Sequence, residues 1–192
     1  MTADLFGTPD LIAGFQYRAD VLSPKEEDEM LGWLPNLPFR AFEFHGFEGK
    51  RRVVSFGWKY DFSAQRLIAV DPLPVEFAPV LQRVSGLFGI EEGALQQLLV
   101  TEYGQGAAIG WHRDKAAFGK VVGVSLGAAC IMRLRKKRGT TWLRHNIGLD
   151  PRSAYLLSGE VRTDWEHSIP PVQEPRFSLT FRTLASYTGP AA

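Results

Sequence analysis

Two side chains that can bind a metal ion stand two residues apart, at His112 and Asp114, after a glycine-rich turn (Gly104, Gly106 and Gly110). In an extended segment, residues two apart point to the same side, so both side chains can reach one point. An imidazole and a carboxylate placed in this way supply two ligands for a divalent metal. Taken alone, the His-x-Asp pattern is more typical of a surface loop.

A second imidazole is available at His167, which follows an apolar segment (155–157) and a Ser158-Gly159 turn. If this segment neighbours that of His112 in a barrel, both imidazoles reach the same point. Two histidines and one carboxylate with open positions form the facial triad of non-haem Fe(II) oxygenases. The alternative is a histidine that is hydrogen-bonded near a turn. We expect the other two histidines, His45 and His145, not to be ligands.

Two arginines, Arg176 and Arg182, stand six residues apart in an extended segment and share one face of it. An arginine directed into a core is costly unless it meets an anion, and its planar guanidinium binds a carboxylate through two hydrogen bonds. A small dicarboxylate that also chelates iron would explain why these arginines accompany a metal triad, and 2-oxoglutarate is such a molecule. The alternative is an exposed edge strand with solvated arginines.

The elements that must position these residues begin with helices. Ser23 and Glu26 form a capping box with proline at the first helical position, which predicts a helix from Pro24 to about Leu34. Apolar residues at helical spacing predict a second helix from about Val75 to Phe88, with a stop at Gly89.

Short strands dominate the rest of the chain. Two segments between the helices, Ala41 to His45 and Arg52 to Phe56, suit a hairpin or a long flap. An α+β fold is therefore expected, with a sandwich or jelly roll packed by helices on one side. The strands expected after Gly93 are Leu98 to Tyr103, Val121 to Leu126, Cys130 to Leu134, Thr141 to Leu143, Ala154 to Leu157 and Phe177 to Thr183.

The composition is that of an ordinary globular protein, with 192 residues, a net charge of +1 and 45% hydrophobic residues. No repeat or linker divides the chain, so we expect a single domain over residues 1–192. Residues from about 1 to 97 would supply helices and a substrate flap, and residues from about 98 to 183 the jelly-roll core.

A single cysteine, Cys130, excludes an internal disulfide and a cysteine-built zinc site, and its apolar surroundings predict a buried thiol. The first ten residues lack a basic segment followed by an apolar run, and no stretch is long enough to cross a bilayer. We expect a cytoplasmic, monomeric protein that does not act at a membrane.

One local excess of positive charge interrupts the near-neutral balance of the chain. Six cations fall within twelve positions that hold no acidic residue. A solvated hairpin tip explains them, and nucleic-acid binding is the second hypothesis, because binding depends on where charge lies. The six are Arg133, Arg135, Lys136, Lys137, Arg138 and Arg144.

Four motifs in register resemble those of the AlkB-like family of Fe(II)- and 2-oxoglutarate-dependent dioxygenases, over roughly the C-terminal half of the chain. One such motif is weak evidence, whereas four in order are specific. The resemblance implies a double-stranded β-helix, a form of jelly roll, with helices that support one sheet. The motifs are Tyr103-Gly-x-Gly with His112-x-Asp114, Val121 to Gly127, Ser158-Gly-Glu-x-Arg162-x-x-Trp165-x-His167-x-Ile169, and Arg176-x-x-x-x-x-Arg182.

Carried over residue by residue, the resemblance implies that His112, Asp114 and His167 bind Fe(II). It also implies that Arg176 pairs with the distal carboxylate of 2-oxoglutarate and that Tyr103 donates a hydrogen bond to the same end. The cofactors implied are therefore Fe(II), the cosubstrate 2-oxoglutarate and O2.

Three further residues are implied around the cosubstrate. Arg182 is expected near Asp114 and near the iron-bound carboxylate of 2-oxoglutarate. Ser178 and Thr101 stand where the family often has asparagines that contact the cosubstrate. This is a departure from the family pattern, although both hydroxyls can still donate a hydrogen bond.

In this family, the chain before the barrel supplies a flap over the substrate, where Arg51, Arg52, Trp58 and Tyr60 fall. Aromatic rings mixed with arginines can stack an extruded or single-stranded base and hold its phosphates. Ordinary core packing of Trp58 and Tyr60 is the alternative.

No carboxylate follows closely after Asp114, where repair-type members often have one. This departure favours the branches that act on RNA or on protein over those that repair DNA.

The reaction implied is the decarboxylation of 2-oxoglutarate to succinate and CO2, coupled to hydroxylation of a C–H bond. On an N-methyl group, the hydroxylated product releases formaldehyde. We expect modified nucleobases in RNA or single-stranded DNA as the substrate. Two alternatives remain: an oxygenase that acts on a protein side chain or a small molecule, and a catalytically silent nucleic-acid-binding module.

Overall fold

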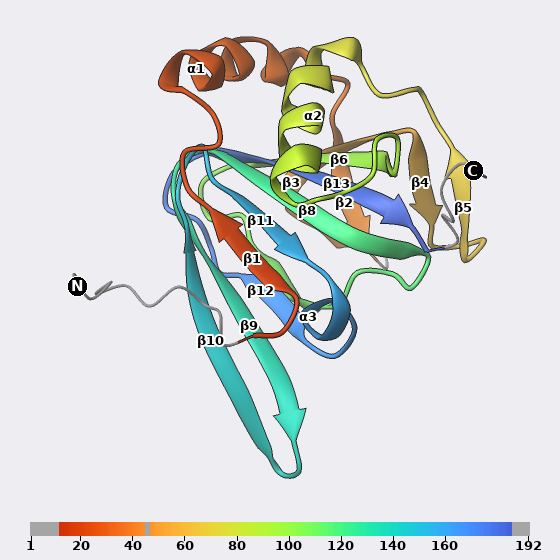
Figure 1. Cartoon of the computed structure of the whole chain (residues 1–192), viewed down its shortest axis with the longest axis vertical. Helices are drawn as coiled ribbons and strands as arrows, with labels where there is room; N and C mark the ends of the chain where they lie inside the picture. The colour runs from red at the N-terminus through yellow and green to blue at the C-terminus, as the bar shows by residue number, and fades with distance from the viewer. Residues whose placement is uncertain (1–11, 45–46, 186–192) are drawn as a thin grey trace.

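Two antiparallel sheets dominate the computed structural model, which describes residues 12–44 and 47–185 (Figure 1). The large sheet has seven strands, in the order β1 (Phe15–Arg18), β11 (Ala154–Leu157), β8 (Phe118–Gly127), β13 (Arg176–Leu184), β6 (Leu95–Tyr103), β3 (Phe47–Phe56) and β2 (Arg40–Phe44). The small sheet has four, in the order β10 (Thr141–Leu149), β9 (Cys130–Arg138), β12 (Glu166–Ile169) and β7 (Ile109–His112). A separate hairpin pairs β4 (Trp58–Asp61) with β5 (Arg66–Ala69).

The two sheets form the jelly roll that the resemblance implied. Every strand pairing given for the described residues is antiparallel, and the sequence-distant strands β13 and β6 lie side by side over nearly their whole length. The expected α+β class, with a double-stranded β-helix, is confirmed. The N-terminal half contributes more than helices and a flap, because β1, β2 and β3 are strands of the large sheet.

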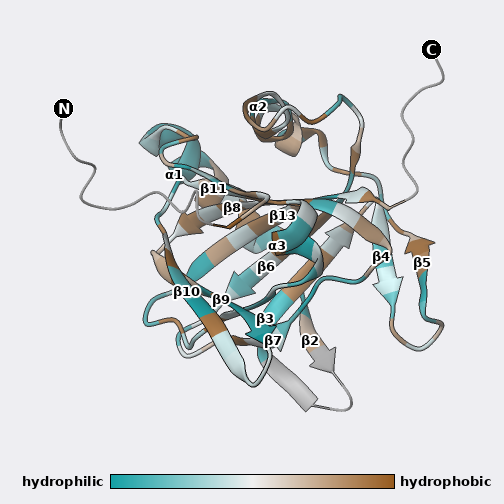
Figure 2. Ribbon diagram, turned by 60° about the horizontal axis from the view of Figure 1, so that its bottom comes forward, coloured by the Kyte–Doolittle hydropathy of each residue, from teal (hydrophilic) through white to brown (hydrophobic). Residues whose placement is uncertain are grey.

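The helices α1 (Pro24–Trp33) and α2 (Ala78–Leu87) lie on the same side of the large sheet (Figures 1 and 2). The predicted capping box is present, because the Ser23 hydroxyl accepts from the Glu26 N–H at 3.2 Å while the Glu26 carboxylate accepts from the Ser23 N–H at 2.7 Å. Both predicted helices are confirmed. A 3₁₀ turn at Leu34–Asn36 follows α1 directly, and another at Val75–Phe77 directly precedes α2.

One buried carboxylate fixes α1 to the sheet. Glu27 accepts a hydrogen bond from the backbone N–H of Gly127 at 2.8 Å and another from the Arg152 guanidinium at 3.1 Å. A buried carboxylate needs such partners, because its charge is otherwise costly to remove from water. The helix is therefore attached at a defined point of β8.

Apolar side chains fill the space between the helices and the large sheet. Alternate residues of β13, Leu179 and Phe181, are fully buried there with Leu98 and Val100 of β6. The intervening residues of β13 point to the opposite side, because successive side chains alternate across a strand. This side faces the small sheet, so the strand separates an apolar core from a polar interior.

A second apolar cluster closes one part of the space between the two sheets. It contains residues of the small sheet and of the large sheet together with α3 (Gly159–Thr163). Polar side chains occupy another part of the inter-sheet space, beside a smaller apolar cluster that includes Ala107, Ile169 and Val172. The fully buried members of the second cluster include Met132, Leu134, Leu149, Leu157 and Val161.

Several elements are longer than the sequence predicted, or were not predicted. The strand β10 runs to Leu149 instead of Leu143, because it pairs with β9 from Thr141–Arg138 to Leu149–Cys130 and turns its polar residues to solvent. Four residues carry little pattern, so most of the four-residue strands were not predicted, although β11 was predicted with its observed bounds. The unpredicted elements are β1, β4, β5, β7, β12 and α3.

Cys130 is partly rather than fully buried, because it is the first residue of β9. Burial nevertheless raises the pKa of its thiol, which disfavours the nucleophilic thiolate. Among the residues that the structure describes, no helix is long and apolar enough to span a membrane.

Candidate active site

The small sheet brings His112 and His167 together. They occupy opposite positions on the adjacent strands β7 and β12, and their ring centroids are 4.2 Å apart. The Nδ1 atom of His112 lies 2.9 Å from the carbonyl oxygen of Gly110. If this nitrogen carries the proton and donates it there, Nε2 keeps its lone pair free for a metal.

Asp114 follows β7 and turns its carboxylate toward the same point. Its side chain is 7% exposed, and its Oδ2 lies 3.7 Å from the Nε2 atom of His167. Its Oδ1 accepts from Arg182, whose Nε and Nη2 atoms lie 3.0 and 2.7 Å away. The expectation that Arg182 lies near Asp114 is therefore confirmed.

The electrostatics of these groups suit metal binding. Burial alone would raise the pKa of Asp114, but Arg182 and the two imidazoles outweigh it and hold that pKa well below its ordinary value. Burial and the neighbouring His112 lower the pKa of His167 to about 4. At neutral pH the cluster therefore offers an ionised carboxylate and neutral imidazoles, the forms that bind metals.

No group of three or more His, Cys, Asp or Glu side chains within the described ranges is already arranged to hold a metal ion. The 3.7 Å between His167 and Asp114 is wider than the roughly 3 Å that separates adjacent ligand atoms at metal bonds of about 2.0–2.2 Å. The donor set itself fits Fe(II), since it combines two imidazoles with one carboxylate. The assignment of these three residues as iron ligands remains a prediction, and the chemistry of the donor set supports it.

A fully buried guanidinium lies deeper between the sheets. Arg176 is 1% exposed and donates one hydrogen bond, from Nη2 to the Ser125 hydroxyl at 3.0 Å. Its Nε and Nη1 atoms have no partner among the described residues. Buried polar groups are almost always paired, so two unpartnered donors on one cation are exceptional. A carboxylate of 2-oxoglutarate would supply the anion that this buried cation lacks.

The other residues expected at the cosubstrate surround Arg176. Tyr103 stands opposite it in the sheet, with its ring centroid 4.7 Å from the guanidinium carbon. Burial raises the pKa of Tyr103, so its hydroxyl remains a donor. Ser178, opposite Thr101, is also buried. The strand register thus assembles all four side chains on one face.

Three polar residues at the site were not assigned roles from the sequence. Ser125 accepts from Arg176, and Gln97 accepts from Arg182 at 2.8 Å. Gln97 belongs to no motif, and Ser125 lies in the Val121 to Gly127 motif, but only the strand register shows that they meet the two arginines. The third, Arg162, does belong to a motif, and its motif could have marked it.

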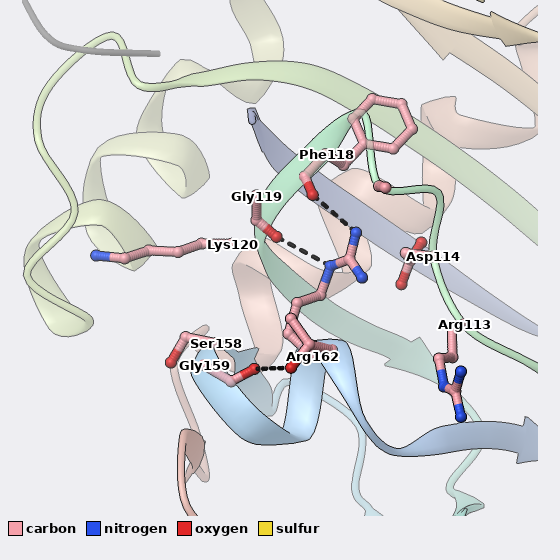
Figure 3. Close-up of a pocket in the computed structure, with 10 residues that line it drawn as sticks. Arg113, Asp114, Phe118, Gly119, Lys120, Ser158, Gly159 and Arg162 are labelled. Carbon is pink, nitrogen blue, oxygen red and sulfur yellow. Dashed lines mark hydrogen bonds between the residues drawn. The ribbon is translucent and has the colours of Figure 1, made fainter. Parts of the chain in front are cut away.

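Arg162 connects α3 to the loop that follows Asp114 (Figure 3). Its guanidinium donates to three backbone carbonyls, those of Lys115 at 2.6 Å, Phe118 at 2.7 Å and Gly119 at 3.0 Å. Arg162 also lines, with Asp114, a cavity of about 500 Å³. These bonds hold the backbone just beyond Asp114 in one conformation.

The four residues expected at the substrate are placed differently from one another. Arg51 stands opposite Tyr103 in the sheet, and burial lowers its pKa. Arg52 is exposed and forms an ion pair with Glu102. The side chains of Arg51 and Arg52 therefore point to opposite faces of β3, and only that of Arg51 points toward the site.

Trp58 and Tyr60 lie on β4, in the separate hairpin. The Lys115 ammonium, one residue beyond Asp114, lies 5.2 Å from the Tyr60 ring centroid and 5.0 Å from that of Phe62. The structure therefore brings Tyr60 beside the Asp114 loop.

The two histidines that were not expected to be ligands lie elsewhere or are not described. His145 lies on β10, beside Trp165, and His45 is outside the described residues.

The profile of the 2OG-Fe(II) oxygenase superfamily matches residues 41–182. The chain belongs to this superfamily. As a 2OG-Fe(II) oxygenase, it is an oxidoreductase that uses Fe(II), 2-oxoglutarate and O2, and the resemblance to the AlkB-like members is confirmed.

Curated relatives of this oxygenase come from plants, viruses and animals. It is 30% identical over 145 residues to an "Alkylated DNA repair protein ALKBH8 homolog" of Arabidopsis thaliana, covering 63% of the chain but 42% of that protein. A protein of Acanthamoeba polyphaga mimivirus is 31% identical over 188 residues, which cover 89% of the chain and 85% of that protein. The "tRNA (carboxymethyluridine(34)-5-O)-methyltransferase ALKBH8" of Mus musculus is 26% identical over 174 residues, which cover 86% of this chain and 25% of that protein.

Solved structures of other oxygenases show the same fold. OsALKBH1 matches with a TM-score of 0.68 at 15% identity, covering 88% of this chain and 96% of that one. A Pseudomonas putida prolyl-4-hydroxylase matches with a TM-score of 0.63 at 13% identity, covering 89% of this chain and 92% of that one.

Proposed function

We propose that this oxygenase hydroxylates or oxidatively demethylates modified nucleobases in RNA or DNA. The names of its relatives support a nucleic-acid substrate, since one is called an alkylated DNA repair protein homolog and another a tRNA methyltransferase. The same proposal includes a cytoplasmic, monomeric enzyme with one catalytic domain over residues 1–192.

His112, Asp114 and His167 hold the iron in this proposal. Bound iron supplies the activation of O2 and the oxidative decarboxylation of 2-oxoglutarate. The protein keeps both imidazoles neutral and the carboxylate ionised, and Arg182 orients Asp114 through two contacts to a single oxygen, Oδ1. The other carboxylate oxygen, Oδ2, remains directed toward His167.

Arg176 is the observation that carries the cosubstrate assignment. Its guanidinium is fully buried and keeps donors without a partner, and a carboxylate is the anion that arginine binds in a bidentate manner. Tyr103, Thr101 and Ser178 offer hydroxyls at the same face, and Arg182 lies at the metal end. A dicarboxylate can therefore extend from Arg176 toward Asp114.

The substrate nucleotide would enter beside the β4–β5 hairpin. Tyr60, with Lys115 beside it, offers a ring for stacking, and Arg51 places a cation near the site. Trp58 lies on the same hairpin, and Arg52 on the far face of β3 can reach only flanking phosphates. Aromatic stacking and phosphate contacts are the usual means of holding an unpaired base.

The proposed metal site is tested by 2-oxoglutarate turnover. We expect His112→Ala to abolish Fe(II)-dependent succinate formation, because it removes a ligand, while His145→Ala, two strands away from His167 in the small sheet, keeps it. Succinate formation that is undiminished in His112→Ala would contradict the ligand assignment.

The substrate class is tested by incubating the iron-loaded enzyme and 2-oxoglutarate with methylated RNA and single-stranded DNA oligonucleotides. Mass spectrometry should find loss of a methyl group, and formaldehyde should appear with succinate. Nucleic-acid binding without any turnover would instead support a catalytically silent module. Turnover on protein extracts alone would contradict a nucleic-acid substrate.

A further inference from the structure

The two faces of the small sheet differ in character. His167 stands opposite Leu134 of β9, and Leu134 is buried between the sheets. Arg133 and Arg135, on either side of Leu134, therefore point to the outer face, away from the active site. The outer face is the one that solvent reaches.

The strand register collects further residues on this outer face. Arg144 stands opposite Arg135, and Trp142 opposite Lys137. Trp111 joins them, because its ring contacts both Arg133 and Arg135. We name this surface the Trp–Arg face, which comprises Trp111, Arg133, Arg135, Lys137, Trp142 and Arg144.

Cations and indole rings alternate along the Trp–Arg face. The guanidinium carbon of Arg135 lies 4.3 Å from the ring centroid of Trp111 and 4.3 Å from that of Trp142. The guanidinium of Arg133 lies 5.0 Å from the Trp111 ring and donates to the Ser168 hydroxyl at 3.0 Å. These contacts order both indoles while leaving them only partly buried.

The charge of the Trp–Arg face is mostly uncompensated. Glu166 pairs with Arg135 at 2.6 Å, but Lys137 and Arg144 are exposed and form no ion pair with any described residue. By contrast, Lys136 points the other way and pairs with Glu160 and Asp164 at 3.0 and 2.9 Å. The unpaired charge of the hairpin is thus concentrated on one face and at its tip.

We propose that the Trp–Arg face binds single-stranded nucleic acid, holding the nucleotides that flank the one in the active site. This inference rests on the proposed function. The cations of β9 recur every second residue, about 7 Å apart, which suits successive phosphates. Ordered indoles offer surfaces on which unpaired bases stack. An acidic protein would form ion pairs with the cations but would leave the exposed faces of the indole rings without a stacking partner.

The hairpin suits this role because it projects from the rest of the molecule (Figure 1) and is largely hydrophilic along β9 and β10 (Figure 2). It extends away from α1 and α2, so the helices do not cover its outer face. A strand of nucleic acid held there can continue around the edge of the sheet toward the site.

The charge of the face is tested with a Lys137→Glu/Arg144→Glu variant. Anisotropy of fluorescein-labelled 20-nucleotide RNA and DNA should show at least tenfold weaker binding at low salt. The salt slope should fall by about 1.4, since each lost single-strand phosphate contact accounts for about 0.7. An Arg18→Glu/Lys25→Glu variant, with the same charge change near the helices, should bind like the wild type.

The stacking is tested with Trp142→Ala and Trp142→Phe. We expect about tenfold weaker binding to the single strand for alanine and recovery of most of the affinity for phenylalanine. Succinate formation without nucleic acid and the melting temperature check that each variant is folded.

The outcomes separate the two proposals. If the wild type binds neither RNA nor DNA, the proposed function is contradicted. If the wild type binds but the charge variant binds equally well, the Trp–Arg face is not the binding surface. If charge reversal weakens binding and Trp142→Ala does not, the face attracts the strand by charge alone, and the inference that its indoles stack unpaired bases is overturned.

Discussion

At the scale of single residues, Arg176 is the clearest sign of function. A guanidinium removed from water without an anion costs stability, and natural interiors rarely retain such a group. The site therefore sacrifices stability in order to bind a carboxylate. The same logic explains Arg182, whose charge is already matched by Asp114.

Replacing Arg176 should separate cosubstrate binding from iron binding. We expect Arg176→Ala to raise the 2-oxoglutarate concentration for half-maximal turnover at least a hundredfold, because two charge-assisted hydrogen bonds are lost. Iron affinity, measured by metal titration, should change little. Arg176→Lys should recover only part of the loss, because an ammonium lacks the planar geometry of arginine. An unchanged 2-oxoglutarate requirement would place the anchor elsewhere.

A second variant at this position tests the cost of the unpaired charge. Without 2-oxoglutarate, Arg176→Met should melt at a higher temperature than the wild type, since an apolar side chain of similar length replaces an unpartnered cation. Adding 2-oxoglutarate and Mn²⁺ should then raise the wild-type melting temperature more than that of the variant. Equal melting temperatures without ligand would show that the charge is compensated.

At the scale of elements, α3 acts on the site through Arg162. Its three hydrogen bonds to backbone carbonyls hold the loop after Asp114, although α3 is one short helix. Residues that orient metal ligands typically alter metal affinity by 10- to 100-fold when they are replaced.

We therefore expect Arg162→Lys to raise the Fe(II) concentration required for turnover about tenfold. A lysine cannot reach three carbonyls at once, so Asp114 loses its fixed position. Fe(II) titration of succinate formation measures this, with Arg18→Lys on β1 as an exposed control. An unaltered iron requirement together with a lower melting temperature would assign Arg162 a purely structural role.

The elements also show what the sequence could predict. Apolar residues at helical spacing and the capping box predicted both main helices, and β-branched or aromatic runs predicted every strand of the large sheet except β1. The short strands β7 and β12, which position His112 and His167, escaped because Gly110 and Ser168 interrupt their pattern. Partners such as Ser125 and Gln97 could not be predicted, because only strand pairing brings them to the arginines.

At the scale of the whole molecule, β13 joins stability to catalysis. Leu179 and Phe181 belong to the core beneath the helices, while Arg176, Ser178 and Arg182 point into the site. The two functions lie on opposite faces of the same strand. They should respond separately to substitution, even at adjacent positions.

A pair of neighbouring variants tests this division. Leu179→Ala should destabilise the fold by about 2–5 kcal/mol, because it leaves a cavity in a fully buried position. Its 2-oxoglutarate requirement should stay close to that of the wild type. Ser178→Ala should show the reverse, with a raised 2-oxoglutarate requirement and a nearly unchanged melting temperature. Thermal melts and steady-state kinetics on both variants measure this. A raised 2-oxoglutarate requirement in Leu179→Ala, or a lowered melting temperature in Ser178→Ala, would contradict the division.

The alternation of β13 also limits how this chain can change in length over evolutionary time. Inserting or deleting one residue between Arg176 and Arg182 would put the two arginines on opposite faces of β13, so one of them would point into the apolar core and part of the aliphatic face would point toward the site. Both functions would be lost in one event. The loops tolerate such changes because no alternating pattern passes through them. Related chains should therefore vary in length in their loops but not along this strand.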